Sequence, residues 1–300
     1  MTPQPKAFGP TSSAATDIVV DNTINEPLNG VSSTNELAFT NGTTTTTILS
    51  QNTTLACALR VLTVEAAAIT HAAQLYTNSV PVHRMLLAAV NVITGVHAHG
   101  GKVVVCGIGK SGHIGGKLVA TLNSLGVSAA FLHAAEAVHG DLGVVRDVDV
   151  LLFVSSSGGT GELLNVLPHV ASQVPIIALT GHADASACPL LVGRKLFDPD
   201  LGKNEEQGGG HKDGKGIGIL LPTPVHESEE QSFGVGAPTT STIVTMAVGD
   251  MLAVAVSEKI YGAEKAHVFQ RNHPGGVLGT RVALQWDDNS SDSCCYSRKK

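Results

Sequence analysis

Two short segments combine glycine with side chains that can donate hydrogen bonds to a phosphate. The first, Gly107–Gly112, contains Lys110. The second, Ser155–Gly161, contains the hydroxyl groups of Ser155, Ser157 and Thr160. Backbone N–H groups in glycine turns and at helix starts favour anions, and hydroxyl and ammonium groups add further donors. The sequence therefore predicts a phosphate site built from these two segments.

Three motifs compete for the first segment. Gly107-Ile-Gly109-Lys-Ser-Gly112 fits the dinucleotide pattern G-x-G-x-x-G, although a lysine inside the tight turn is unusual for that pattern. The same residues end like a P-loop, but that motif needs glycine at position 104, where the chain has Val104, and we reject it. The third possibility is a sugar-phosphate site in which Lys110 takes part in the chemistry.

Both segments follow apolar runs, Val103–Cys106 and Val148–Val154, that predict buried strands. Apolar residues at helical spacing after the first segment predict a helix that begins near Ser111 or Gly112. Further strands are predicted at Val127–Leu132, Pro175–Leu179 and Leu190–Leu196. Strands that alternate with helices at this spacing predict a parallel sheet with helices on both faces. In such sheets ligands bind at the carboxyl ends of the strands, where both glycine segments are expected.

The expected organisation is one α/β domain over residues 51–285. Residues 1–50 are rich in Thr, Ser and Asn and predict a disordered tail, and residues 286–300 predict a polar tail. Inside the domain, a glycine-rich stretch at about 198–228 predicts a flexible insertion. Two helices are expected before the first strand, and a long apolar helix is expected from Ala237–Thr242 to about Tyr261.

Composition excludes several classes of protein. A formal net charge of −6 gives no electrostatic reason to expect nucleic acid as a partner. No apolar run reaches the roughly 18 residues of a membrane helix, so no membrane partner is expected. Secretory and mitochondrial signals are not expected either, and the cytoplasm is the predicted location. The five cysteines have no regular spacing and predict reduced thiols. His97 and His99 fit the end of a helix, and no metal site is expected.

Five motifs, in this order, resemble the SIS (sugar isomerase) domain of arabinose-5-phosphate isomerases, and they cover residues from about 100 to 284. They are Gly107-x-Gly-Lys-Ser-Gly-His-Ile-Gly115, Glu136-Ala-x-His-Gly-Asp-Leu-Gly143, the Ser-x-Ser-Gly loop that ends in Glu162, Ala237-Pro-Thr-x-Ser-Thr242 and His273-Pro-Gly-Gly-x-Leu-Gly279. The resemblance implies a three-layer α/β/α sandwich with a five-stranded parallel sheet, flavodoxin-like and usually tetrameric. The paired CBS modules of many relatives are not expected, because too few residues follow His273.

The resemblance also implies a function and its residues. Members interconvert an aldose 5-phosphate, arabinose 5-phosphate, with ribulose 5-phosphate through an enediolate and need no redox cofactor. The implied catalytic residues are Lys110, Glu162, Glu230 and His273. The implied substrate-binding residues are Gly109, Ser111, His139, Ser155, Ser157 and Thr160. Lys110 would stabilise the developing negative charge, and which acidic or imidazole group takes the C2 proton stays open.

Alternatives remain for the function and for single residues. The function is either that of an isomerase or that of a SIS regulator that binds a sugar phosphate without converting it. The family usually has Asn and Glu where this chain has Ser156 and Gly159, and the segment before Ala-Pro-Thr also departs from the pattern. Glu227 and Glu229 are therefore rivals of Glu230. Glu162 would also suit a helix start, Lys110 a plain phosphate contact, and each histidine a backbone contact in a glycine loop.

Overall fold

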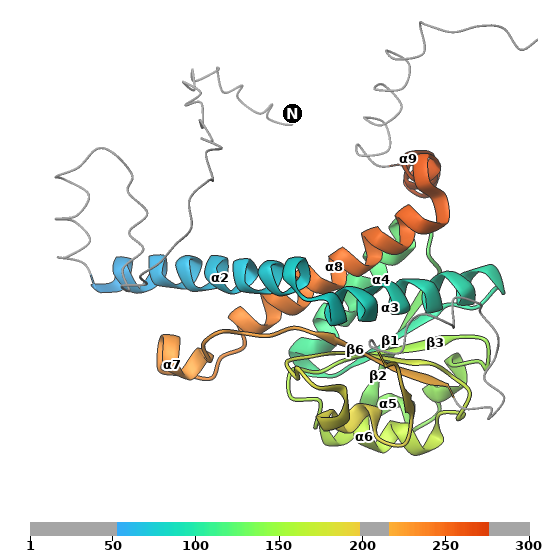
Figure 1. Cartoon of the computed structure of the whole chain (residues 1–300), viewed down its shortest axis with the longest axis horizontal. Coiled ribbons are helices and arrows are strands. Elements are labelled where there is room, and N and C mark those ends of the chain that lie inside the picture. The colour runs from blue at the N-terminus through green and yellow to red at the C-terminus, as the bar shows by residue number, and fades with distance from the viewer. Residues whose placement is uncertain (1–52, 199–215, 276–300) are drawn as a thin grey trace, which may run out of the picture. The chain divides into compact units, whose positions relative to one another are not determined.

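The computed structural model describes residues 53–198 and 216–275, which form a parallel sheet with helices on both faces (Figure 1). The expected tails at 1–50 and 286–300, and residues 199–215 of the expected insertion, lie outside the described residues. The strands of the described chain are β1 (Val103–Gly107), β2 (Ala129–His133), β3 (Val150–Val154), β4 (Ile176–Thr180), β5 (Lys195–Leu196) and β6 (Ile217–Pro222).

The strands pair in the order β2-β1-β3-β4-β6-β5, and every pair is parallel. The predicted α/β fold with a parallel sheet is therefore confirmed, and the described residues form six strands where five were expected. The strand expected at Leu190–Leu196 is shorter than predicted. A 3-10 turn occupies Pro189–Leu191, and only Lys195 and Leu196 pair with β6.

The additional strand, β6, lies inside the segment expected to be a flexible insertion. Ile219, Leu220 and Leu221 are buried, and they pair between β4 and β5. The glycines before this run predict a loop, yet Gly218 lies in a tightly packed position. A Cβ atom there would lie 3.1 Å from Cβ of Arg194. Burial of the Ile-Leu-Leu run thus outweighs the local preference of glycine for irregular structure.

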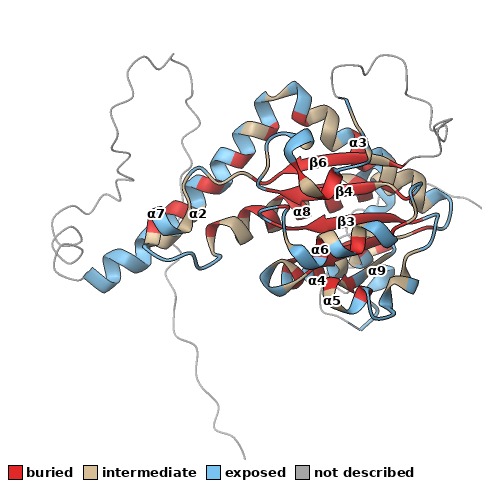
Figure 2. Ribbon diagram, turned by 90° about the horizontal axis from the view of Figure 1, so that it is seen from below, coloured by how far each residue is buried: buried red, intermediate tan, exposed pale blue. Residues whose placement is uncertain are grey.

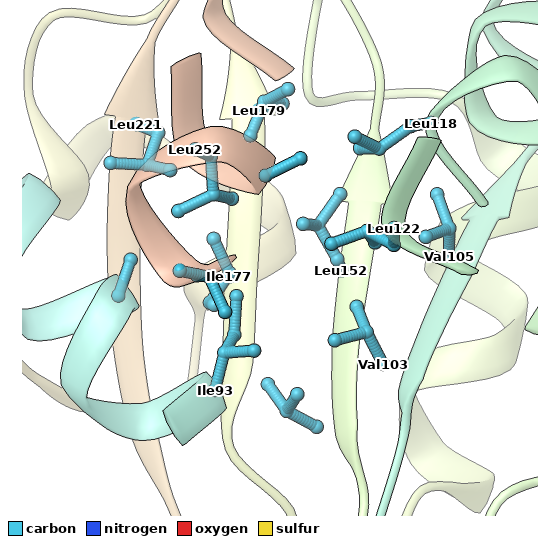
Figure 3. Close-up of a cluster of buried hydrophobic side chains, with 14 of the residues drawn as sticks. Ile93, Val103, Val105, Leu118, Leu122, Leu152, Ile177, Leu179, Leu221 and Leu252 are labelled. Atoms are coloured by element: carbon cyan, nitrogen blue, oxygen red, sulfur yellow. The ribbon is translucent and has the colours of Figure 1, made fainter. Parts of the chain in front are cut away.

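Alternating side chains of the strands separate the core into two layers, as the two-residue period of a strand requires. On one face Val103, Val105 and Leu152 pack with Leu118, Leu122 and Leu252 of the covering helices (Figure 3). On the other face Val104, Cys106 and Phe153 pack with Leu163 and Val166. Figure 2 shows the strands as the most completely buried part of the molecule. The predicted three layers of helix, sheet and helix follow from this division.

The helices of the described chain fall into these two layers. The first face is covered by α3 (Val80–Ala98), α4 (Gly109–Ser124) and α8 (Thr240–Tyr261). The second is covered by α5 (Ala134–Ala137) and α6 (Gly161–Val166), with 3-10 turns at Asp141–Val144, Leu167–His169, Ala185–Ala187 and Pro189–Leu191. The remaining elements are α2 (Thr53–Asn78), α7 (Glu229–Phe233), a 3-10 turn at Gly262–Glu264 and α9 (Lys265–Asn272).

Helix α4 lies close to the sheet because its inner face contains glycine. A Cβ atom on Gly115 would lie 3.0 Å from the ring of Phe131 in β2 and 3.2 Å from the side chain of Val105 in β1. Larger side chains at this position would push the helix outward. The position of α4 therefore depends on Gly115, and the same helix begins with the residues that the sequence assigns to chemistry.

Two described helical runs, Thr53–Asn78 and Thr240–Asn272, are long and apolar enough to cross a membrane by length and composition alone. More than half of the apolar window in the second run is buried inside the domain. In the first run, Ala68 and Ala72 pack on Val244 of α8, and the hydroxyl of Tyr76 donates to the Pro222 carbonyl at 3.0 Å. Burial raises the pKa of Tyr76 above its ordinary value. The C-terminal half of α2 is thus part of the domain.

Candidate active site

The two glycine segments lie side by side because β1 and β3 are neighbours in the sheet. Cys106 is paired with Phe153, and each strand ends one residue later, so both strands end at the same edge. Helix α4 begins there at Gly109, and Lys110 is its second residue. The loop Ser155–Gly161 leaves β3 at the same edge and leads into α6, in which Glu162 is the second residue. The topology therefore brings Lys110 and Glu162 to neighbouring loops.

The turn between β1 and α4 is tight. A Cβ atom on Gly107 would lie 2.9 Å from the Ser111 carbonyl oxygen, so only glycine allows the helix to start this close to the strand. Gly109 has φ of +57°, a conformation that glycine adopts without strain. These two positions explain the G-x-G spacing without a dinucleotide. The turn leaves Lys110 exposed and Ser111 half-buried.

The loop after β3 is closed by its own hydroxyl groups. The hydroxyls of Ser155 and Thr160 lie 2.9 Å apart, and the amide of Gly159 donates to Oγ of Ser157 at 3.2 Å. The amide of Gly158 donates to the Ser155 carbonyl at 3.2 Å, which makes the first part of the loop a turn. Ser155 is buried, whereas Ser157 and Glu162 are exposed. Of the hydroxyls assigned to phosphate, that of Ser157 is therefore the most open to solvent.

The end of β2 provides the other side of this edge. His133 pairs with Gly107 of β1, and α5 follows immediately and packs against α6. His139 comes two residues after α5, is exposed, and its amide donates to the Glu136 carbonyl at 2.9 Å. The histidine segment thus lies next to the Lys110 turn, on the opposite side from the serine loop.

Two of the three candidate glutamates, Glu229 and Glu230, lie on α7, which stands apart from the sheet on the side of α2 (Figures 1 and 2). Glu227 precedes this helix. Glu229 binds the start of α8, because its carboxylate accepts from the amide and hydroxyl of Ser241 at 2.9 and 2.6 Å. Burial acts to raise the pKa of Glu229, but these donors outweigh it and hold the pKa below its ordinary value. Glu230 is exposed, and its carboxylate lies against Gly236. Glu229 is thus engaged in structure, whereas the side chain of Glu230 is exposed.

His273 lies at the opposite edge of the sheet. Its Nε2 is 3.3 Å from Oγ of Ser124, the last residue of α4, and its Nδ1 is 2.8 Å from the Phe269 carbonyl. The imidazole also stacks on the ring of Phe269, with 4.0 Å between the ring centroids. Lys110 is 14 positions before Ser124 in the same helix, which corresponds to about 21 Å along its axis. One chain therefore does not bring His273 to the edge that contains Lys110.

The predicted site residues thus fall into three groups. The turn after β1 and the loop after β3 bring seven of them to adjacent loops: Gly109, Lys110, Ser111, Ser155, Ser157, Thr160 and Glu162. His139 lies beside them on the β2 side. Glu230 lies on α7 and His273 at the far edge, so within one chain neither joins the others. The assignment of roles to these residues remains a prediction.

Two histidines that the sequence pattern does not assign to the site, His182 and His133, lie at or near it. His182 follows β4, and its Nε2 lies 2.8 Å from the Ser157 carbonyl. His133 has a buried Nδ1 without a partner among the described residues. Glu229 holds the start of α8 by accepting from the amides of Thr239 and Ser241, which lie ten and twelve residues further along the chain. The rule that ligands bind where parallel strands end would have found His182 and His133. No local pattern shows that Glu229, a rival of Glu230, binds the start of α8.

Two buried thiols lie near this edge. Cys106 precedes the Lys110 turn in β1, and burial raises its pKa to about 12. Cys188 lies under the serine loop, and burial also raises its pKa. Both thiols therefore stay protonated at neutral pH and are poor nucleophiles.

Comparison with known proteins identifies a family and individual relatives. Residues 98–190 match the family described as SIS domain. The chain is 39% identical over 196 residues to arabinose 5-phosphate isomerase GutQ of Escherichia coli K12, which covers 65% of this chain and 50% of that protein. It is 36% identical over 191 residues to arabinose 5-phosphate isomerase KdsD of Pseudomonas aeruginosa, covering 63% of this chain and 49% of the relative. The chain thus spans about half the length of these curated relatives.

Two solved structures match this chain over almost their whole length. The E. coli CFT073 protein c3406, solved in complex with A5P, is 30% identical, with a TM-score of 0.52, and the match covers 72% of this chain and 98% of that one. A phosphosugar isomerase of Bacteroides fragilis, described as putative and as involved in capsule formation, is 28% identical, with a TM-score of 0.54, and covers 74% and 98%. The sequence motifs, the parallel sheet and these matches lead to one conclusion: the chain belongs to the SIS domain family.

Proposed function

We propose that the chain is an aldose–ketose isomerase that acts on a sugar phosphate, with arabinose 5-phosphate and ribulose 5-phosphate as the substrate pair. The observation that carries the proposal is the placement of Lys110 and Glu162 on neighbouring loops, with the hydroxyls of Ser157 and Thr160 between them in the chain. A phosphate site beside a cation and a carboxylate is what this reaction requires. The names of the curated relatives and the A5P complex support the choice of pentose phosphate.

The reaction moves one proton from C2 to C1 and rearranges the protons on O1 and O2. A base takes the proton from C2 of the aldose, and the resulting enediolate has its negative charge on oxygen. The Lys110 ammonium would lower the free energy of this intermediate by electrostatic stabilisation. Glu162 is a candidate for either proton transfer, because a carboxylate can accept a proton from carbon and return it. The phosphate contacts would hold the sugar in one orientation throughout.

The same proposal includes a homo-oligomer, expected to be a tetramer. If His273 and Glu230 act in the reaction, they must reach the edge with Lys110 from another copy of the chain, because one chain holds them elsewhere. The exposed apolar side chains at the start of α2 also favour contact between copies, since such clusters on soluble domains mark association surfaces. These side chains are Leu55, Leu59 and Leu62. The proposed location is the cytoplasm, which suits the free thiols of Cys57, Cys106 and Cys188.

The experiment is to incubate the purified protein with arabinose 5-phosphate and to follow ribulose 5-phosphate by NMR. We expect conversion by the wild-type protein and a loss of roughly 10²-fold or more in Lys110→Met and Glu162→Gln, the usual range for losing an electrostatic donor or an acid–base group. The exposed Lys117, seven residues further along α4, offers a matched control, and Lys117→Met is expected to convert at the wild-type rate. Binding without conversion would leave the regulator as the function.

A further inference from the structure

The loop after β3 is held in place by the loop after β4. The Ser156 carbonyl accepts from the Gly181 amide at 2.9 Å and from the Thr180 hydroxyl at 3.1 Å. The next carbonyl, that of Ser157, lies 2.8 Å from Nε2 of His182. Two successive carbonyl groups of the serine loop are therefore fixed by groups at the end of β4 or directly after it. Among the described residues, His182 is the only one whose side chain forms a hydrogen bond with the Ser157 carbonyl.

The direction of the His182 hydrogen bond follows from its partner. A carbonyl oxygen only accepts, so Nε2 of His182 must have the hydrogen and donate it. The neutral ring with its hydrogen on Nε2 makes this bond, and so does the imidazolium. The contact is therefore kept whichever charge state the ring adopts.

The peptide after Ser157 also depends on this imidazole. Gly158 has φ of +59°, and a Cβ atom there would lie 3.0 Å from Cδ2 of His182 and 3.3 Å from Sγ of Cys188. The glycine thus fits between the histidine ring and the buried thiol with no room for a methyl group. Packing on Gly158 and the hydrogen bond to the Ser157 carbonyl fix this peptide unit from the β4 side, and its N–H donates to the Ser155 carbonyl at 3.2 Å within the loop.

A peptide that is not fixed can turn over and exchange the directions of its carbonyl and N–H groups. In a loop that binds an anion, such a turn would direct a carbonyl oxygen at the ligand and repel it. The bond from His182 holds the Ser157 oxygen toward the β4 side. The exposed hydroxyl of Ser157, which accepts from the Gly159 amide, belongs to the same short turn.

We propose that His182 is a positioning residue for phosphate binding, because its Nε2–H fixes the Ser157–Gly158 peptide and thereby the binding conformation of the serine loop. This inference rests on the proposed function, in which that loop holds the phosphate of the substrate. His182 acts through Ser157 and is not itself a catalytic residue. It follows β4, which is separated from β1 and Lys110 by β3.

The test compares two replacements at position 182. Glutamine has an amide N–H at nearly the place of Nε2, so His182→Gln keeps the donor, whereas His182→Leu removes it. With arabinose 5-phosphate, we expect His182→Leu to raise KM and the calorimetric Kd about 10-fold, the effect of losing one hydrogen bond, with kcat within about 3-fold of wild type. His182→Gln is expected to stay within about 3-fold in all three quantities. The matched control is His169→Leu, an exposed imidazole after α6, with no expected effect.

Several results would overturn the inference. The first is a Kd of His182→Leu equal to that of the wild-type protein. The second is a fall in kcat of His182→Leu with KM unchanged. The third is a His182→Gln variant that binds as weakly as His182→Leu. If His182→Leu does not fold, a long-range ¹H–¹⁵N NMR spectrum of the wild-type protein decides, because a neutral His182 with its hydrogen on Nδ1 contradicts the bond. A wild-type protein that binds neither arabinose 5-phosphate nor inorganic phosphate would instead refute the proposed function, so the two failures are distinguishable.

Discussion

Nε2 of His273 lies 3.3 Å from Oγ of Ser124, at the end of the helix whose first turn contains Lys110. The side chain of Asn272 supports this position, since its amide donates to the carbonyls of Asn123 and Ser124 at 3.2 and 3.3 Å. Residues expected to be catalytic thus lie both at the carboxyl ends of the strands, with Lys110, and at the amino ends, with His273. A closed oligomer in which the Lys110 end of one chain contacts the His273 end of a second chain would combine them.

This relationship predicts complementation between inactive variants. Lys110→Met and His273→Asn should each be inactive alone. In co-expressed mixtures, some sites would combine an intact Lys110 from one chain with an intact His273 from another, and random mixing in a two-chain site restores about a quarter of wild-type activity. Isomerase assays of the co-purified mixture measure this recovery.

The control for complementation pairs two residues on neighbouring loops of one chain. Co-expression of Lys110→Met with Glu162→Gln should restore nothing, because every site then has one of the two changes. Recovery in this control, or no recovery in the first mixture, would contradict a site completed by His273 from a second copy.

A second prediction concerns the serine loop. Ser157→Ala combined with Thr160→Ala should raise KM for arabinose 5-phosphate by about 10-fold or more, while kcat changes by less than about 3-fold. Phosphate contacts are similar in the ground and transition states, so their loss weakens binding without slowing the bound substrate. Steady-state kinetics separate the two quantities. Ser156→Ala, an exposed serine of the same loop, should behave as wild type, and a collapse of kcat with constant KM would refute the phosphate assignment.

A third prediction concerns Asp149, a fully buried carboxylate at the amino edge of β3. It accepts from the Lys102 ammonium at 2.6 Å and from the amides of Lys102 and Arg146 at 2.9 and 2.8 Å. Asp149→Asn should lower the free energy of unfolding by about 3 kcal/mol, because it leaves these donors without a charged acceptor. Urea denaturation measures the change. The neighbouring exposed Asp147→Asn should stay within about 0.5 kcal/mol of wild type.

The same carboxylate gives a pH dependence with a definite sign. Burial acts to raise the pKa of Asp149, but the hydrogen bonds from Lys102 and Arg146 outweigh it and hold the pKa below its ordinary value. A lowered pKa stabilises the folded state above the unfolded pKa of about 3.9, and this contribution is lost as the pH falls through the folded value. The difference in stability between wild type and Asp149→Asn should therefore shrink below about pH 4. A difference that grows in acid would contradict this assignment.

Much of the fold follows from the sequence because the central strands are short apolar runs that end in turns rich in glycine or serine. Val103–Cys106 and Val148–Val154 identify β1 and β3, and the turn chemistry identifies α4. The strand Ile217–Pro222 is less visible, because glycines before it and prolines at its end favour a loop, and only burial between β4 and β5 decides.

The candidate site is predictable where its residues follow the strands directly, as Lys110 and Ser157 do. The position of His273 is not, because it depends on the length of α8 and on the docking of α9 against the far end of α4. The role of His182 is equally hidden, since its partner Ser157 is 25 residues away in the chain.

The most direct test of the proposed isomerase is exchange of carbon-bound hydrogen with the solvent. Ribulose 5-phosphate is incubated with the protein in heavy water, and ¹H NMR follows deuterium at C1 and net formation of the aldose, while calorimetry records binding. The account predicts binding, conversion, and deuterium at C1 of the ketose and C2 of the aldose wherever the base exchanges its proton with solvent. A base shielded from solvent would suppress the label but not the conversion, so both are measured. Protein that binds sugar phosphates yet neither labels nor converts them would contradict the isomerase.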